Sequence, residues 1–520
     1  MSKRIQLICL LALLTGTGCN SSKKENVKKV PLPKSELSIQ SDNATLQDGF
    51  NWAVNKTGQF VMTGQEGVVN KDERNKNGTG TAVYIPSYWA GYYDRTAFYG
   101  RDFVHQAVGA QIVGLWDENY SMFKIFAANA TEARDWWTLW AFNFDGTPHQ
   151  IDYRGDEKFV KEVPAQFELI EMAYKQYLWS GDKRYVTDSV LWNFYTRTLT
   201  DFVDLHDTNN NGVAEGKGGI WAGSCTYNER GEYPIEAGDG IACQYQATLA
   251  YAHMLKARGE KEQAQSWYDK ATELKKYFNN KWSVLNGNSS DSYARGINKK
   301  GVKLTGFGKE NSWFMPLKLI TEPGKRNDDY LQFISENLGE GIGTMPTAPH
   351  NIEAYTYIPD MYFHYNWNDE AWKWMKYILS VKDLPHERPS QGTNGDYPEI
   401  SYTIVSQVVE GMMGIDPNAI TGHITTAARL PKGVNIVKIN NVRFGNYRVD
   451  VEHTGIQKTV LTNQSSQVLN WEVRFYGAHK ALIVNGKSIN AEQKNINGEK
   501  VSFVNVSVDS GLTVTVETGA

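Results

Sequence analysis

The feature that most constrains the fold of this chain is a helical pattern repeated between about residues 45 and 415. Segments such as 159–180, 239–258 and 262–278 place apolar residues three and four positions apart, with charged residues on the opposite face. That spacing is typical of amphipathic helices. It predicts about twelve of them, at 45–60, 102–115, 118–141, 158–181, 184–206, 239–258, 262–281, 309–321, 326–338, 350–364, 367–379 and 401–415.

Long loops rich in glycine and aromatic residues separate alternate pairs of these helices, at 62–101, 207–238, 283–308 and 380–400. Six helical hairpins with their long loops on one side predict a mainly α fold, a six-hairpin (α/α)6 toroid. The inner helices of such a ring begin at the loop side. Their free N–H groups and positive dipole ends can meet hydroxyls or carboxylates there. We therefore expect one pocket, lined by the loops and the inner-helix N-termini.

The pattern changes after Pro417. From Val434 onward apolar and polar residues alternate, and the Asn485-Gly486 and Asn497-Gly498 pairs are typical of hairpin turns. This predicts a small C-terminal antiparallel β-sandwich. The predicted domains are 41–417 for the toroid and 418–520 for the sandwich.

The N-terminus resembles an export signal. Lys3 and Arg4 precede a short apolar stretch at 5–14, and small residues lead to Cys19. The stretch is too short to span a membrane as a helix. A Cys after small residues resembles a bacterial lipoprotein cleavage site, although Gly16 replaces the usual Leu. We expect a signal peptide at 1–19, lipidation of Cys19 and a flexible tether at 20–40, in a cell-envelope protein of the periplasm or outer-membrane surface. The alternative is cleavage with release.

The composition of the chain limits the classes of molecule that it is expected to bind. The net charge of -4 provides no basic footprint for nucleic acid. Aromatic residues make up 12% of the chain, with 16 Trp and 28 Tyr. Because the C–H faces of sugar rings stack on aromatic faces, this composition suits an oligosaccharide, although a large helical core also uses such side chains. No protein partner can be predicted from the sequence.

Three loop segments at predicted inner-helix starts carry candidate site residues. The first contains Tyr99 and the Arg101–Asp102 pair, which is costly at the start of an apolar helix unless it meets a partner or ligand. The second follows Trp221 and contains four carboxylates, Glu229, Glu232, Glu236 and Asp239. The third, at 392–399, ends in Glu399. A carboxylic acid and a carboxylate that face each other can cleave a glycosidic bond.

The order of these segments resembles the helical-toroid glycosidases, especially the glucosidase domain of glycogen debranching enzymes and the glucoamylases. Residues 99–102 (YGRD) resemble their Gly-Arg-Asp signature, and 177–182 (YLWSGD) resemble a helix-ending segment of the family. Residues 237–255 resemble the helix after the acid-bearing loop, and 392–399 (GTNGDYPE) resemble their Gly-Thr…Pro-Glu segment. The end of the chain, from Ile400 onward, also resembles bacterial α-L-rhamnosidases.

The resemblance implies a role for each matched position. Arg101 and Asp102 would hold the terminal sugar, Glu399 would be the general base, and Tyr99 and Trp221 would shape the pocket wall. One departure matters: no carboxylate directly follows Trp221, where those families place the acid. Glu229 is the nearest acidic residue downstream and becomes the expected acid, with Glu236 next and assigned to substrate binding.

The missing acid leaves other chemistry open. A lyase or dehydratase acting on acidic oligosaccharides needs a proton abstractor and often a Tyr or His acid. The chain offers Tyr227, His350, His364 and His386. A third possibility is a non-catalytic surface glycan-binding lipoprotein. The leading hypothesis is an exo-acting, inverting glycoside hydrolase that acts on oligosaccharides from polysaccharide breakdown.

One segment is relevant to metal binding. Residues 207–212 (DTNNNG) match the first half of a calcium loop, but position twelve is Gly218 rather than Glu. A polar turn explains the segment as well, so the sequence predicts no cofactor, with calcium as the alternative. No cluster of His and Cys indicates zinc.

Overall fold

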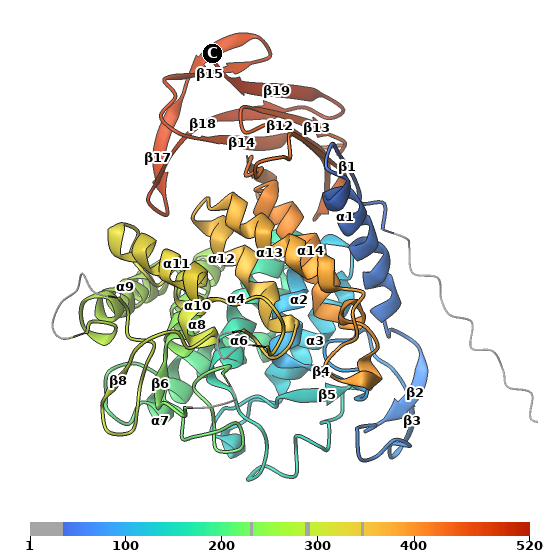
Figure 1. Ribbon diagram of the computed structural model, residues 1–520, viewed down its shortest axis with the longest axis vertical. Helices are drawn as coiled ribbons and strands as arrows, with labels where there is room; N and C mark the ends of the chain where they lie inside the picture. The colour runs from blue at the N-terminus through green and yellow to red at the C-terminus, as the bar shows by residue number, and fades with distance from the viewer. Residues whose placement is uncertain (1–34, 229–231, 286–291, 345–347, 520) are drawn as a thin grey trace, which may run out of the picture.

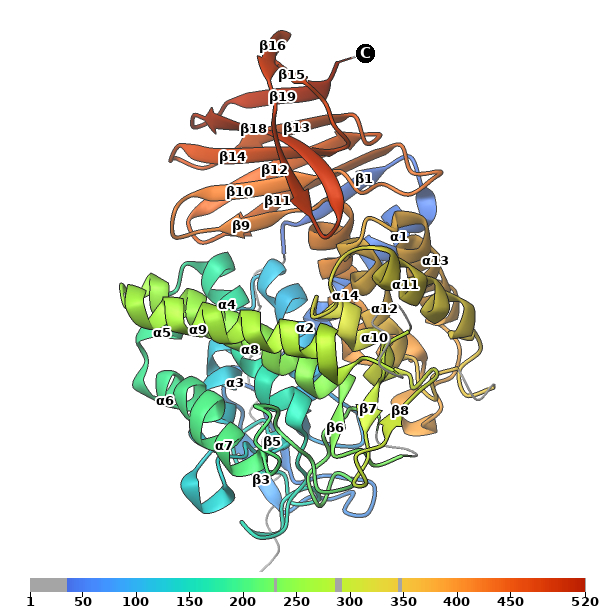
Figure 2. The ribbon, with the colours of Figure 1, turned by 90° about the vertical axis from the view of Figure 1, so that its left-hand side faces the viewer.

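The computed structural model describes residues 35–228, 232–285, 292–344 and 348–519. Cys19 and Glu229 therefore lie outside the described residues. The chain divides into a helical body and a β-sandwich that covers one end of it (Figures 1 and 2). Within the described ranges, no helix is both long enough and apolar enough to cross a membrane.

Six buried helices pack in a closed order. Contacts run from α2 to α4, α8, α10 and α12, and α14 with its continuation η8 (Gln407–Met412) contacts both α12 and α2. The bounds are α2 Gly100–Ile112, α4 Val163–Ser180, α8 Gly238–Ala257, α10 Glu310–Leu317, α12 Ile358–His364 and α14 Pro398–Ser406. Every residue of α10 and α14 is buried, as expected of helices enclosed on all sides.

A second set of helices alternates with these along the chain and lies outside them. They are α1 Ala44–Thr57, α3 Trp116–Ala128, α6 Ser189–Arg197, α9 Lys261–Tyr277, α11 Lys325–Asn337 and α13 Asn368–Val381. In α9 only Ala264 and Ala271 are fully buried. Its other positions are largely charged or polar, as expected of a helix that lies at the surface.

Two predicted helices are wrong in extent. The helix predicted at 118–141 ends at Ala128. It cannot extend to 141, because Asp135 and Trp136 have φ values of 51° and 62°, in the left-handed region that an α-helix excludes. The helix predicted at 184–206 is interrupted by Asp188. This residue has an extended backbone, and its carboxylate caps α6 by accepting from the N–H groups of Val190 and Leu191, so α5 (Arg184–Thr187) stops before it.

The sandwich consists of a seven-stranded and a five-stranded sheet. The first has the order β1-β11-β12-β13-β19-β15-β16, with β1 Ser38–Ser41, β11 Ile436–Phe444, β12 Tyr447–Thr454, β13 Lys458–Asn463, β19 Thr513–Thr518, β15 Ala481–Val484 and β16 Lys487–Asn490. The second has the order β17-β18-β14-β10-β9, with β17 Glu492–Ile496, β18 Glu499–Val508, β14 Leu469–Tyr476, β10 His423–Ala427 and β9 Asp416–Asn418.

Two features correct the predicted sandwich. The sheets are not wholly antiparallel, because β10 pairs in parallel with β14. The predicted tether at 20–40 overlaps a strand, since β1 pairs with β11 and buries Leu37 and Ile39 in the core. The segment 37–41 carries only two apolar residues, Leu37 and Ile39, too few to stand out as a strand. The predicted boundary at 417–418 therefore omits an N-terminal strand from the sandwich.

The opposite end of the helical body carries the long loops and three small sheets (Figures 1 and 2). They are formed by β2 (Glu66–Val69) with β3 (Gly80–Val83), β4 (Ala97–Tyr99) with β5 (Ala141–Asn143), and β6 (Glu236–Ala237) with β7 (Gly296–Ile297) and β8 (Lys303–Leu304). Strand β4 leads directly into α2, and β6 leads directly into α8. These two strands fix the starts of α2 and α8, and with them the residues of these helices that reach the loop end.

Candidate functional site

Glu399 is the second residue of α14 and is almost fully buried. Its Oε1 atom accepts a hydrogen bond from the Thr356 hydroxyl at 2.6 Å and lies 2.7 Å from Nδ1 of His105. Within the described part of the chain no hydrogen bond occupies Oε2. One oxygen of this carboxylate is thus fixed by the protein, and the other is left for a bound molecule.

His105 holds Glu399 in place from α2. Its imidazole stacks on the Tyr357 ring with centroids 3.6 Å apart, and Nε2 lies 3.5 Å from the Asp360 carboxylate. Burial disfavours the imidazolium, but the charges of Glu399 and Asp360 outweigh burial and raise the pKa of His105 to about 9. His105 is therefore protonated at neutral pH, and its contact with Glu399 is a charge-assisted hydrogen bond.

This arrangement predicts a pH-dependent stability. The folded-state pKa of His105 lies above its ordinary value of 6.5, so the stabilisation is fully present below about pH 6.5 and is lost as the pH rises through 9. The loss amounts to about 3 kcal/mol. We expect the melting temperature of the wild type to fall more steeply than that of His105→Gln between pH 6.5 and 9. The control His479→Gln, in the sandwich, keeps the wild-type slope. Equal slopes for His105→Gln and wild type would show that His105 is not charged in the folded protein.

Asp102 lies near the start of α2, is half-buried and lines the same small pocket as Glu399. The Tyr397 hydroxyl donates to its carboxyl group. Burial, followed by the charge of Glu399, raises the pKa of Asp102 to about 7. Asp102 and Glu399 line one small pocket of about 70 Å³. The two carboxyl groups therefore differ in character, because one is held by a cation and a hydroxyl while the other tends to keep its proton.

Arg101 connects this pocket to the middle loop. Its guanidinium stacks 4.5 Å from the centroid of the Tyr227 ring, donates to the Tyr227 carbonyl at 3.2 Å and lies 3.6 Å from the Glu310 carboxylate. The Tyr227 hydroxyl in turn donates to buried Glu168. The predicted Arg101–Asp102 pair thus lines the same small pocket as Glu399.

A larger cavity of about 370 Å³ adjoins the small pocket. Tyr92, Arg95 and Arg101 line both. Trp221, 42% exposed, lines the larger cavity, and Tyr99 lines the smaller pocket. The Tyr99 hydroxyl donates to Asp152 and accepts from Arg95, so this side chain contributes its ring rather than its hydroxyl to the wall.

The structure places Glu236 elsewhere. Its side chain is fully buried, and its carboxylate accepts hydrogen bonds from Asn209, Asn211 and Trp282 at 2.6–2.8 Å. Its role is to hold the loop before β6 together, which corrects its assignment to substrate binding. Glu229, the expected acid, lies outside the described residues.

Two of the alternative proton donors also lie apart from the small pocket. His364 lines a separate cavity of about 380 Å³, and burial lowers its pKa to about 3. His386 lies 3.6 Å from Glu353, and its ring stacks on that of Tyr397, behind the pocket wall. Burial raises the pKa of Tyr227 well above its ordinary value, and its hydroxyl already donates to Glu168.

The segment compared with a calcium loop forms a closed turn. The Asp207 carboxylate accepts from the backbone N–H groups of Asn211 and Gly212. The amides of Asn209 and Asn211 donate to Glu236. Among the residues that the structure describes, no three His, Cys, Asp or Glu side chains group so as to hold a metal ion.

Sequence reasoning missed several residues of the site. His105 follows Asp102 by three positions on α2, so helical spacing alone places the two on one face. Tyr92 and Glu353 line the small pocket, and the Tyr92 hydroxyl donates to Glu353 at 2.7 Å. They come from segments far apart in the chain, and no local pattern connects them.

No protein-family model and no curated protein matches this sequence. Several solved structures do match this protein in fold. The GH78 family rhamnosidase of Bacillus sp. GL1 aligns with a TM-score of 0.58 and 11% identity, covering 81% of this chain and 41% of its own. The α-L-rhamnosidase from Dictyoglumus thermophilum aligns with a TM-score of 0.56 and 13% identity, covering 93% of this chain and 51% of its own.

A third structure is the Streptomyces avermitilis α-L-rhamnosidase complexed with L-rhamnose, with a TM-score of 0.54 and 12% identity, covering 93% of this chain and 42% of its own. This chain thus spans about half the length of these proteins or less. At such identities the likeness concerns the fold alone. The chain shares the fold of glycoside hydrolases and is similar to them over most of its described length.

Proposed function

We propose that this protein is an exo-acting, inverting glycoside hydrolase with an (α/α)6 catalytic domain. The closed order of the six buried helices and the fold shared with rhamnosidases support the toroid. The observation that carries the activity is the pair of unlike carboxyl groups in one pocket, Glu399 and Asp102. A glycan-binding protein has no need of such a pair.

Glu399 is the general base of the proposed reaction. His105 and Thr356 fix its Oε1 atom, so Oε2 can take a proton from a water molecule that attacks the anomeric carbon. The small pocket suits the terminal sugar of a chain, and the larger adjoining cavity suits the sugars that follow it. Arg101 would orient the terminal sugar from the wall that the small pocket and the larger cavity share.

The general acid must protonate the leaving oxygen. Glu229 remains the predicted acid. Asp102 is a second candidate, because it lines the small pocket with Glu399 and a carboxyl group whose pKa is about 7 keeps its proton in about half of the molecules at neutral pH. If Asp102 is not the donor, its role is the predicted one of holding the terminal sugar.

The proposal is tested by incubating the purified protein with a panel of oligosaccharides and determining the mass of the products. A hydrolase releases a monosaccharide and adds one water across the cleaved bond. Elimination on an acidic oligosaccharide, the alternative chemistry, leaves the summed mass unchanged, and a dehydratase yields a product lighter by one water. Tight binding without any product would favour the glycan-binding role.

We also propose that the protein is anchored to the cell envelope through a lipid on Cys19. The signal-like segment at 1–19 supports this. The variant Cys19→Ala is expected to move from the membrane fraction to the soluble fraction, with the acyl mass absent from its N-terminal peptide. A wild-type protein that is wholly soluble and unacylated would contradict the anchor.

A further inference from the structure

The larger cavity carries a concentration of positive charge that the chain as a whole lacks. Its lining contains six cationic side chains and two carboxylates, whereas the net charge of the protein is -4. The cationic residues are Arg74, Arg95, Arg101, Arg154, Lys309 and Arg388. Such a cavity, walled by protein of low dielectric constant, attracts anions more strongly than the same charges would on an open surface.

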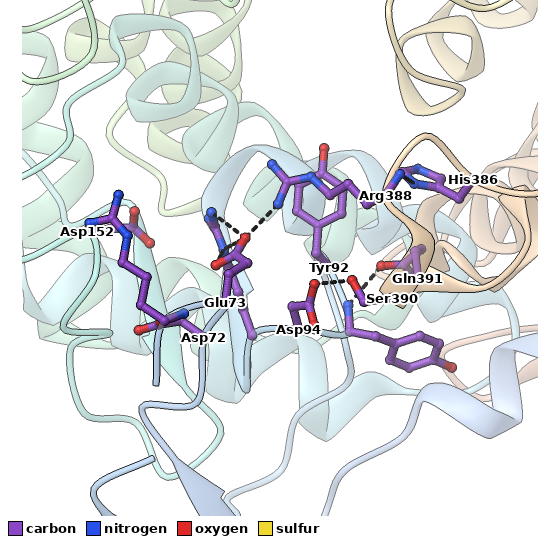
Figure 3. Close-up of polar contacts among 12 residues, drawn as sticks. Asp72, Glu73, Tyr92, Asp94, Asp152, His386, Arg388, Ser390 and Gln391 are labelled. Carbon is purple, nitrogen blue, oxygen red and sulfur yellow. Dashed lines mark hydrogen bonds and ion pairs between the residues drawn. The ribbon is translucent and has the colours of Figure 1, made fainter. Parts of the chain in front are cut away.

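A third carboxylate, that of Glu73, is shared between two of these guanidinium groups. Glu73 lies 3.0 Å from Arg95 and 2.7 Å from Arg388 (Figure 3). Burial tends to raise the pKa of Glu73, but the two arginines outweigh it and lower that pKa to about 2. Glu73 therefore carries one full negative charge against two positive ones. The six cationic side chains of the cavity outnumber the three carboxylates Asp152, Glu310 and Glu73.

The wall around Arg388 is fixed in position. The Tyr92 ring lies 3.7 Å beneath the Arg388 guanidinium, the Ser390 hydroxyl donates to Asp94, and the Gln391 side chain accepts from the Tyr93 backbone N–H at 2.8 Å (Figure 3). These contacts tie the segment 386–391 to the loop before β4. The orientation of Arg388 is therefore set before a ligand arrives.

The lining of the cavity also includes Arg154 and Trp221. The Arg154 guanidinium lies 5.0 Å from the centroid of the Trp221 ring, and both side chains are exposed to solvent. Within the residues that the structure describes, no ion pair joins Arg154 or Arg74 to a carboxylate. A guanidinium stacked on an aromatic face keeps its edge free for two parallel hydrogen bonds to a planar or tetrahedral anion.

We propose that the larger cavity binds an anionic substituent on the sugars that follow the terminal one, so that the substrate is an acidic oligosaccharide. This inference rests on the proposed function, which sets that the terminal sugar of the oligosaccharide occupies the small pocket and the following sugars occupy the larger cavity. The anion is a carboxylate of a uronic acid or a sulfate ester, since the fork of an arginine accepts either.

The experiment compares three oligosaccharides of equal length: a uronic-acid oligosaccharide, its carboxyl-reduced neutral counterpart and a sulfated one. Binding is measured by titration calorimetry on the wild type and on Glu399→Gln, at 50 and 300 mM NaCl. We expect at least one acidic series to bind at least about 10-fold more tightly than the neutral one, and the preference to shrink at high salt. Whichever acidic series binds more tightly identifies the anion.

The variant Arg154→Gln, also combined with Arg74→Gln, is expected to reduce the acidic-to-neutral preference by at least about fivefold. The control Lys487→Gln, exposed on β16 of the sandwich, leaves the preference unchanged. Equal affinity for all three series, no binding of either acidic series by a folded protein, or a preference that Arg154→Gln does not alter would overturn the proposal.

The two proposals fail separately. A protein that binds acidic oligosaccharides without cleaving any oligosaccharide contradicts the hydrolase and supports the anion site. A protein that binds neutral and acidic oligosaccharides with equal affinity and cleaves them at equal rates contradicts the anion site and supports the hydrolase.

Discussion

Replacing Glu399 by Gln is expected to reduce turnover by about 10²- to 10⁴-fold while the protein remains folded. The substitution keeps the size of the side chain and its hydrogen bond from Thr356 but removes the charge that would activate water. The variant loses the charge-assisted bond to His105, so its melting temperature should fall by a few degrees only. Turnover is measured with the best substrate of the oligosaccharide panel, and folding by circular dichroism and thermal melting.

The matched control is Glu492→Gln, a substitution of the same kind at an exposed position of β17. It should change neither turnover nor stability. Full activity of Glu399→Gln would remove Glu399 from the reaction, and with it the site assignment for hydrolysis and for elimination alike. If Glu399→Gln does not fold, Glu399→Asp is assayed in its place. This variant keeps the charge but withdraws it from the pocket by one methylene group.

Replacing Asp102 by Asn is expected to separate proton donation from sugar binding. If Asp102 protonates the leaving oxygen, turnover of an oligosaccharide falls by about 10²- to 10⁴-fold. A glycoside of the same terminal sugar whose leaving group is an acidic phenol needs no proton, so its turnover should stay within about tenfold of the wild type. The wild-type rate on oligosaccharides should also decline above about pH 7, where Asp102 loses its proton.

The same two substrates distinguish the other outcomes. Equal losses on both substrates show that Asp102 holds the terminal sugar. The variant Glu229→Gln, assayed beside it, identifies the donor if it alone shows the leaving-group dependence. Wild-type activity of Asp102→Asn on both substrates would contradict any role of Asp102 at the site.

Local pattern was sufficient to predict most of the helices and to propose two of the candidate site residues. Apolar residues at helical spacing located α8, α9 and α13 to within a few residues, because each is long and strongly one-sided or fully buried. Arg101 and Asp102 were proposed because charged residues at the start of an apolar helix are costly unless they serve a ligand or a partner, and Glu399 because residues 392–399 resemble a segment of the toroid glycosidases. The structure brings all three together at the loop end.

Other features depend on contacts between distant segments. Glu236 has the composition and position of a site residue, but its contacts with Asn209, Asn211 and Trp282 make it structural. The contact between His105 and Glu399 joins positions 294 residues apart. The strand β1 forms only because β11 offers it an edge to pair with. None of these contacts leaves a periodic signal in the sequence.

Hydrolysis at the Glu399 pocket can be followed by carrying out the reaction in water enriched in ¹⁸O. We expect wild-type protein to release a terminal monosaccharide carrying one ¹⁸O at its anomeric carbon, initially with the anomeric configuration opposite to that of the bond cleaved, and Glu399→Gln to release almost none. An unsaturated product without ¹⁸O, or labelled product formed equally fast by Glu399→Gln, would contradict hydrolysis at this pocket.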